Sequence, residues 1–189
     1  MQTLTPEEFR LSDGRRLRLR AISPDDKEKM QASLAEQSAQ TRYRRFMTDK
    51  RRLSGAELRY LTEVDGDHHF AVVVVEIDEA GRELQGVCVA RYVELHDAPG
   101  TAEPAIVVSD AFQGLGIGRW VFSRLVDFAR ERGVRSFHCE LLADNRRMLR
   151  ILEDIAPVSQ RHLEGAVLVM SFELADARPG GGPAAAFAT

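Results

Sequence analysis

Residues 105–119, AIVVSDAFQGLGIGR, contain the features that decide the fold. An apolar run ends at a polar break, three glycines then alternate with apolar residues, and a long helical pattern follows. A loop with so few side chains leaves its backbone N–H groups free to face outward, and the helix that starts there adds unpaired donors and a positive dipole end. The stretch therefore predicts a strand, a loop that can bind a diphosphate, and a helix.

The composition is that of one ordinary folded domain. The chain has 189 residues, of which 44% are hydrophobic and 29% charged, which is enough to bury a core. A net charge of -3 gives no general attraction to nucleic acid. The longest apolar run, residues 70–75, is too short to span a bilayer, and the acidic N-terminus lacks the apolar core of a signal peptide. We therefore expect a cytoplasmic protein without nucleic-acid or membrane partners.

The two cysteines and the paired histidines predict neither a disulfide nor a metal site. Cys88 and Cys139 each lie in an apolar, strand-like run, where buried reduced thiols are the expected state. His68 and His69 are neighbours on a predicted strand, so their side chains point to opposite faces and cannot easily share a metal ion.

The chain before the glycine loop is predicted to form a hairpin, three helices and a three-stranded meander. The hairpin turns at Asp13-Gly14, and the first and third helices begin with capping boxes at Ser23 and Ser54. The predicted ranges are residues 9–22 for the hairpin, 23–38, 40–46 and 54–62 for the helices, and 70–77, 84–95 and 102–108 for the strands.

The chain after the glycine loop alternates helix and strand and then ends in an antiparallel pair. The predicted ranges are a helix over 115–132, a strand over 135–142, a helix over 145–155 capped by Asp144, and strands over 158–163 and 167–174. This order predicts a single α+β domain over residues 1–175, with a mixed, mostly antiparallel central sheet flanked by helices. Residues 176–189 are low in complexity and are predicted to be disordered.

Two better-known glycine motifs do not fit the loop. A P-loop ends in Gly-Lys-Ser/Thr, whereas this loop ends in Gly118-Arg119-Trp120. A dinucleotide fingerprint needs glycine at position 119 and follows the first parallel strand, whereas this loop follows an antiparallel meander. Taken alone, the loop is also compatible with a tight connection that binds nothing.

The loop and its surroundings resemble the GNAT superfamily of N-acetyltransferases. Gln113, Gly116 and Gly118 match the pattern Gln/Arg-x-x-Gly-x-Gly/Ala of that family's motif A. The element order matches over residues 17–174, and Asn145 matches an asparagine that opens the helix after the following strand. The resemblance implies a GNAT-type domain with a splayed pair of parallel strands at an acetyl-CoA site.

Four short segments are similar to a narrower group, the acetyltransferase domain of bacterial Pat-type protein lysine acetyltransferases. The segments are residues 41–46 (TRYRRF), 61–65 (LTEVD), 89–92 (VARY) and 145–149 (NRRML). In that group the domain is often fused to a nucleotide-binding or synthetase-like regulatory module, and we expect no such module in this chain.

The resemblance implies a set of residues that bind acetyl-CoA, which is the co-substrate. The backbone of Val107 and Val108 would hold the pantetheine arm, an N–H near Val108 would polarise the thioester carbonyl, and Asn145 would reach the arm or its pyrophosphate end. The pyrophosphate would lie on the amides of Gln113, Gly114, Leu115, Gly116, Ile117, Gly118 and Arg119. The Arg119 side chain adds charge there or is simply a solvated helix residue.

Glu103 is the candidate general base. A lysine ammonium has a pKa near 10.4, so a base must take its proton before it can attack a thioester near pH 7. Glu103 lies on the strand that leads to the loop, where the family carries its catalytic glutamate, although an ordinary exposed strand glutamate fits as well. The next residue, Pro104, removes a strand N–H and leaves local pairing open. The family's tyrosine acid would fall on Leu152, so the general acid stays unassigned.

Three functions follow as hypotheses. The first is acetyl transfer from acetyl-CoA to a protein lysine, for example on an acyl-CoA synthetase. The second is acetylation of a small amine, and the third is a non-catalytic acyl-CoA sensor. An arginine-rich segment, residues 42–52, would dock an acidic protein surface, bind the CoA 3′-phosphate or form a solvated helix face. A homodimer is left open.

Overall fold

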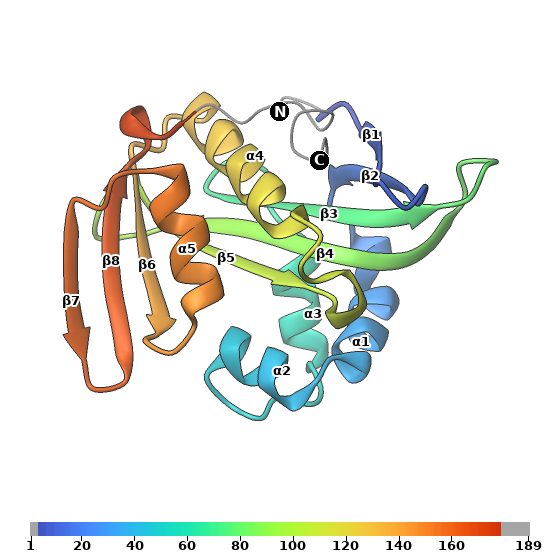
Figure 1. The fold of residues 1–189 in the computed structure, drawn as a ribbon, viewed down its shortest axis with the longest axis horizontal. Helices are drawn as coiled ribbons and strands as arrows, with labels where there is room; N and C mark the ends of the chain where they lie inside the picture. The colour runs from blue at the N-terminus through green and yellow to red at the C-terminus, as the bar shows by residue number, and fades with distance from the viewer. Residues whose placement is uncertain (1–3, 179–189) are drawn as a thin grey trace.

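The central sheet of the computed structural model contains eight strands in the order β1-β2-β3-β4-β5-β6-β8-β7, and the structure describes residues 4–178 (Figure 1). The strands are β1 (Glu7–Arg10), β2 (Arg16–Ala21), β3 (His69–Ile77), β4 (Glu83–Glu94), β5 (Thr101–Val108), β6 (Ser136–Leu142), β7 (Gln160–Glu164) and β8 (Val167–Glu173). The helices are α1 (Lys27–Glu36), α2 (Ala39–Phe46), α3 (Gly55–Thr62), α4 (Ile117–Glu131) and α5 (Arg146–Ile155). Short 3-10 turns are η1 (Pro24–Asp26), η2 (Asp110–Phe112) and η3 (Leu174–Asp176).

This arrangement confirms the predicted α+β fold with a mixed, mostly antiparallel sheet. Only β5 and β6 run parallel; every other neighbouring pair of described strands is antiparallel. The parallel crossover is made by α4, which directly follows the glycine loop (Figure 1). The element boundaries agree with the predicted ranges to within a few residues, which is the usual scatter at element ends.

Helices cover both faces of the sheet. On one face α4 buries Trp120, Phe122 and Leu125, which join a large core that also contains Leu152 of α5 and alternate residues of the strands. On the other face Val73, Val75 and Ile77 of β3 form a smaller cluster, and Met30 of α1 lies against the same side. Because β3 is covered on both faces, almost all of its residues are buried, as its continuous apolar run predicts.

The first residues of the helices show how the local sequence sets the point where a helix begins. The Glu57 carboxylate accepts the N–H of Ser54 at 2.8 Å, and the Glu57 N–H donates to the Ser54 hydroxyl at 3.2 Å, which completes the predicted capping box. At α5 the cap differs from the prediction: Asn145, not Asp144, is the N-cap, and its side-chain oxygen accepts the N–H of Met148 at 3.3 Å. Both residue types cap well, so the sequence left the choice between neighbours undetermined.

The parallel pair β5–β6 is joined only at its beginning. The register pairs Thr101 with Ser136 and Ala102 with Phe137, and no later residue of β5 pairs with β6. On its other side β5 stays paired with β4 along its whole length, up to Val108. An opening therefore begins directly after Ala102, between two strands of an otherwise continuous sheet.

Pro104 does not interrupt the ladder, although the sequence left this open. Leu95 donates its N–H to the Thr101 carbonyl at 2.8 Å, so odd-numbered residues of β5 direct their backbone groups toward β4. The nitrogen of Pro104 therefore faces the opening, where there is no strand to pair with. Proline is tolerated at such an edge position.

The end of the described chain corrects one prediction. Residues 176–178 are ordered rather than disordered, because Ala177 is buried in the core and Arg178 donates its N–H to the Ile155 carbonyl at 2.8 Å. Residues 179–189 of the predicted tail lie outside the described residues. Both cysteines are free and buried, as predicted. Between residues 4 and 178, no helix has the length and apolar character needed to cross a membrane.

Candidate functional site

A cavity of about 660 Å³ lies in the opening between β5 and β6. Its walls come from α2, β5, the glycine loop, the start of α4, β6 and α5, which meet near the lower centre of Figure 1. The sequence-predicted residues Glu103, Val107, Val108, Gln113, Gly114, Gly116, Gly118, Arg119 and Asn145 all line it. Segments far apart in sequence therefore contribute to one site.

The three glycines of the loop do not share one backbone conformation. Gly114 and Gly116 have φ angles of 84° and 80°, a left-handed conformation that side chains other than glycine's disfavour. Gly118 has an ordinary helical backbone, and a Cβ there would lie 3.4 Å from Val108 Cγ2 and 3.6 Å from Ile151 Cδ1. The first two glycines thus shape the loop, whereas a Cβ at the third would make ordinary van der Waals contacts with β5 and α5.

The loop presents free backbone donors to the cavity. Within residues 4–178, the N–H groups of residues 114–119 make no hydrogen bond, and the first intrahelical bond of α4 is donated by Trp120 to the Gly116 carbonyl at 3.1 Å. The positive end of the dipole of this 15-residue helix adds to the field at the same place. These donors fit the diphosphate that the sequence predicts for Leu115, Ile117 and their neighbours.

The side chain of Gln113, at the wall of the cavity, holds the loop in place. Its Nε2 donates to the Val108 carbonyl at 3.1 Å and to Asp110 Oδ1 at 2.9 Å. Its Oε1 accepts from Arg147 Nη1 of α5 at 2.6 Å. The amide thus ties the end of β5, the loop and α5 together.

Asp110 connects the loop to α2, a link that the sequence analysis did not find. Its carboxylate accepts the Ser38 N–H and the Thr41 hydroxyl, each at 2.6 Å. Burial opposes ionisation of Asp110, but these bonds from Thr41 and Ser38, together with the charge of Arg42, hold its pKa below the usual value. No local pattern could reveal a pair of segments separated by about 70 residues of chain.

The backbone of β5 offers hydrogen-bonding groups to the cavity at every second residue. Since odd-numbered residues bond toward β4, the free N–H and C=O groups belong to Ile106 and Val108. The Val108 carbonyl is already used by Gln113, so its N–H is the group that stays available. Val107, which was predicted to hold the pantetheine arm, directs its backbone toward β4 instead, because the register sets its orientation.

Two polar residues at the α5 side have structural partners. Asn145 uses its side-chain oxygen as the cap of α5, which leaves the amide nitrogen for other contacts. Arg119 forms an ion pair with Asp154 at 3.1 Å, and both side chains are about half exposed. Both residues line the cavity, and neither side chain is held by a buried network.

Glu103 stands at the closed end of the opening. It directly follows the last residue of β5 that pairs with β6, its side chain is exposed, and its carboxylate makes no hydrogen bond or ion pair within residues 4–178. Cys139 of β6 is close enough to be affected by it: burial raises the pKa of that thiol, and the Glu103 carboxylate adds to the shift. Cys139 is therefore a neutral wall residue of the site.

The position that carries a tyrosine in the family holds Leu152, which is fully buried here. Among the described residues that line the cavity there is no tyrosine. Within residues 4–178, no three His, Cys, Asp or Glu side chains are grouped so that they could hold a metal ion.

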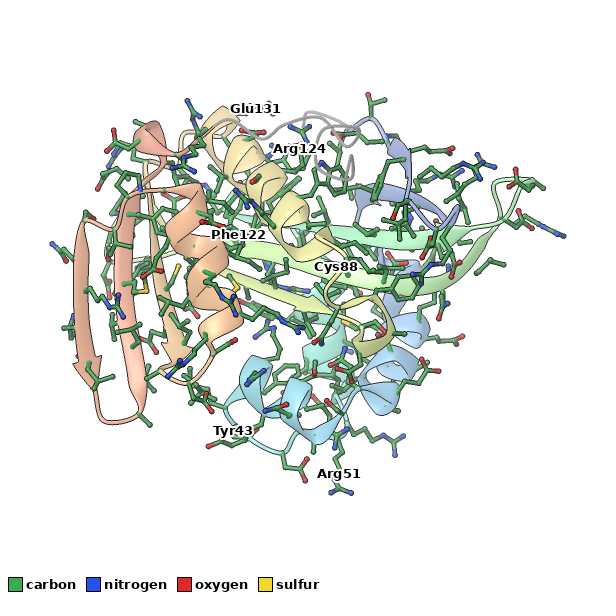
Figure 2. The ribbon with its side chains drawn as sticks, in the orientation of Figure 1. Tyr43, Arg51, Cys88, Phe122, Arg124 and Glu131 are labelled. Atoms are coloured by element: carbon green, nitrogen blue, oxygen red, sulfur yellow. The ribbon has the colours of Figure 1, made fainter. Side chains whose placement is uncertain are left out.

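The arginine-rich segment does not act as one surface. Arg42 is buried, and its guanidinium donates to the Gln37 carbonyl and to Asp49. Arg44 and Arg45 line the cavity. Arg51 is 75% exposed, pairs with Asp49 and points away from the molecule (Figure 2). The sequence could not predict which of these arginines is buried, which line the cavity and which is exposed, because this depends on how α2 packs against β5.

Comparison with known proteins identifies the family. Residues 16–155 match the model of the acetyltransferase (GNAT) domain. The chain is 35% identical over 166 residues to acetyltransferase Pat of Mycolicibacterium smegmatis, which covers 87% of this chain and 48% of that protein. It is 30% identical over 160 residues to acetyltransferase PA5475 of Pseudomonas aeruginosa, with 85% and 84% covered. The chain therefore spans about half the length of the first relative and most of the second.

Solved structures agree. The GNAT domain of S. lividans PAT superposes with a TM-score of 0.76 at 26% identity, with 89% of this chain and 96% of that chain covered. A cAMP-binding acyltransferase from Mycobacterium smegmatis superposes with a TM-score of 0.58 at 29% identity, with 90% and 47% covered. The matched model, the two relatives and the shared fold lead to one conclusion: the chain belongs to the GNAT family and is an acetyltransferase domain.

Proposed function

We propose that this domain transfers the acetyl group of acetyl-CoA to the side-chain amine of a protein lysine, with Glu103 as the general base. The observation that carries the proposal is the opening between β5 and β6, which has unpaired amides at one end and an unpaired carboxylate at the other. A substrate with a diphosphate and a long polar arm fits between them, since the arm can pair with the free backbone groups of β5.

The chemistry follows from the position of these groups. The Glu103 carboxylate takes a proton from the acceptor ammonium, and the freed nitrogen lone pair attacks the thioester carbonyl carbon. The carbonyl oxygen becomes negative, and the N–H of Val108 is placed to donate to it. The C–S bond then breaks, the new amide C–N bond remains, the thiolate takes a proton from water, and the second amine proton is lost to solvent.

Two observations support a lysine on a protein surface as the acceptor. Glu103 is exposed, so an amine carried on a long flexible side chain can reach it from outside the domain. Four segments of the chain are also similar to Pat-type lysine acetyltransferases, and a relative of that name is 35% identical.

The experiment compares Glu103→Gln with the unchanged protein on labelled acetyl-CoA, with lysine peptides and cell proteins as acceptors. We expect kcat to fall about 10²- to 10⁴-fold, the usual contribution of a general base. Acetyl-CoA affinity, measured by calorimetry, stays unchanged because Glu103 lies outside the diphosphate loop.

Glu131→Gln is the matched control, since Glu131 is an exposed glutamate at the far end of α4 (Figure 2). Full turnover by Glu103→Gln rejects the proposed base. Acetylation of polyamines but of no lysine acceptor rejects the proposed substrate.

A further inference from the structure

Two guanidinium groups lie on the same side of the sheet as Glu103. In the register of β4 and β5, Arg91 pairs with Ala105 and Val93 pairs with Glu103, so the side chains of Arg91 and Glu103 share one face and are diagonal neighbours. Arg45 comes from α2, which covers the same face, and it lines the same cavity as Glu103. Segments separated by more than 40 residues thus bring two cations to one carboxylate.

Arg91 is a buried cation without a carboxylate partner. The residue is 5% exposed, and within residues 4–178 the only hydrogen-bond partner of its side chain is His69, whose Nε2 lies 3.2 Å from Arg91 Nη1. The ring of Tyr60 lies against that of His69 in a tilted arrangement, with a centroid separation of 4.8 Å. Burial first, and then the nearby charge of Arg45, lowers the pKa of Arg91 to about 10. A buried charge without a counterion is costly, so its presence here needs a reason.

The side chain of Arg45 forms no hydrogen bond or ion pair within the described residues. Its guanidinium lies 5.0 Å from the ring centroid of Phe46. Arg45 and Glu103 line the same cavity without forming an ion pair; burial lowers the pKa of Arg45, and the Glu103 carboxylate opposes this shift. The unused donors of Arg45 are therefore available to a ligand in the cavity.

The balance of charge here is unusual for a site that takes an ammonium ion. An incoming lysine is attracted by Glu103 but repelled by Arg45 and Arg91. An acceptor that also carries a carboxylate removes this conflict, because a guanidinium binds a carboxylate through a charge-assisted, often bidentate, pair.

We propose that Arg45, with Arg91 buried beneath it, forms an anion subsite beside Glu103 that takes a carboxylate carried by the amine acceptor. On a protein acceptor this carboxylate belongs to an aspartate or glutamate next to the target lysine. On a small acceptor it belongs to the amino acid itself. The inference rests on the proposed acetyl transfer.

The test uses peptides with one lysine and a glutamate or a glutamine at each flanking position in turn. Nα-acetyl-lysine and its amide, which lacks the carboxylate, form the small-molecule pair. Acetyl transfer gives kcat and KM, and anisotropy of labelled peptides gives binding in the presence of CoA. We expect the glutamate peptide at the best position to exceed its glutamine partner in kcat/KM by about tenfold or more, as charged hydrogen bonds do. The difference appears in KM, because the contact is the same before and during the reaction.

Arg45→Gln is the decisive variant, since it removes no side-chain hydrogen bond or ion pair within residues 4–178 and only one cation–π contact, with the Phe46 ring. We expect it to reduce the preference to less than about twofold, whereas Arg45→Lys keeps part of it because the charge remains. Arg51→Gln is the matched control: an arginine from the same segment, exposed and outside the cavity. It retains the full preference.

The outcomes separate the two proposals. Equal acetylation of acidic and neutral acceptors, or a preference that survives Arg45→Gln, overturns the anion subsite and leaves the acetyl transfer standing. If no acceptor is acetylated, the proposed function fails, and binding alone decides the subsite: tighter binding of acidic peptides that is lost in Arg45→Gln supports it, and equal binding overturns it. A preference confined to Nα-acetyl-lysine assigns the carboxylate to a small molecule.

Discussion

The two sides of β5 handle charge by different means. On the backbone side, where β5 meets the opening and α4, the groups available to a ligand are backbone amides. Their positions are set by the left-handed conformations of Gly114 and Gly116 and by the start of α4. On the side-chain side, where β5 faces α2 and α3, the charged groups are the guanidinium groups of Arg45 and Arg91 around the Glu103 carboxylate. Backbone donors bind any diphosphate, whereas side chains can change without disturbing the fold. In the proposed function, the backbone side binds the acyl-CoA, and the side-chain side selects the acceptor.

The largest effect, on the affinity for acetyl-CoA, is expected from Gly116→Val, which deforms the glycine loop. Valine there must adopt a φ near 80°, which costs a β-branched residue about 1–3 kcal/mol and deforms the loop. We expect the Kd for acetyl-CoA to rise roughly tenfold to a hundredfold by calorimetry. Gly14→Val is the control, because Gly14 has a φ of 92° in the turn between β1 and β2 and does not line the cavity. Equal loss of affinity in both variants would mean that global strain, and not the loop, is responsible.

A smaller effect is expected from Asp110, which joins the two sides. Asp110→Ala removes the acceptor for the Ser38 N–H, the Thr41 hydroxyl and the Gln113 amide. We expect the free energy of unfolding in urea to fall by about 1–2 kcal/mol and the acceptor KM to rise as α2 loosens.

Asp49→Ala is the corresponding control. It removes an exposed carboxylate paired with Arg42 and Arg51 and is expected to cost less stability. If Asp110→Ala changed neither stability nor acceptor KM, the link between the loop and α2 would have no energetic role.

A still smaller, pH-dependent effect is expected from His69. Burial, reinforced by the charge of Arg91, lowers the pKa of His69, so the unfolded chain binds a proton at a higher pH than the folded one. Stability is then complete above pH 6.5 and declines as the pH falls from 6.5 toward the folded-state value. His69→Gln keeps an acceptor for Arg91 but cannot titrate.

Urea unfolding at pH 7.5 and 5.5 measures this difference. We expect the wild type to lose more stability than His69→Gln by less than about 1 kcal/mol. His68 gives the internal comparison, because its hydrogen bond to Glu94 raises its pKa, and its contribution is instead lost as the pH rises above 6.5. An identical pH dependence in wild type and His69→Gln contradicts the assignment.

The smallest effect is expected from Arg119, a side chain on the backbone side. It is about half exposed and paired with Asp154, so its charge is screened. Arg119→Gln should change acetyl-CoA affinity by less than about threefold. A much larger loss would show that side chains also carry the diphosphate site and would weaken the contrast between the two sides.

The backbone side could be predicted from the sequence, and the side-chain side could not. Gly114 and Gly116 are followed directly by the helical spacing of apolar residues in α4. Such a pattern lies within one short stretch of chain, so it can be recognised from the sequence alone. The sequence assigned the backbones of both Val107 and Val108 to the arm, and it could not show that they point to opposite edges of β5, because that depends on the register with β4. Arg45 and Arg91 are 46 positions apart, and only the packing of α2 on the sheet brings them to Glu103.

Pro104 has a consequence for any extended molecule that occupies the opening. Such a molecule adds itself to the free edge of β5, where donors from the protein exist at Ile106 and Val108 but not at Pro104. The missing hydrogen removes one donor from this edge, although the Pro104 carbonyl can still accept a hydrogen bond. The part of such a molecule that lies beside Glu103 is therefore held by fewer hydrogen bonds, and can move more easily, than the part beside Ile106 and Val108.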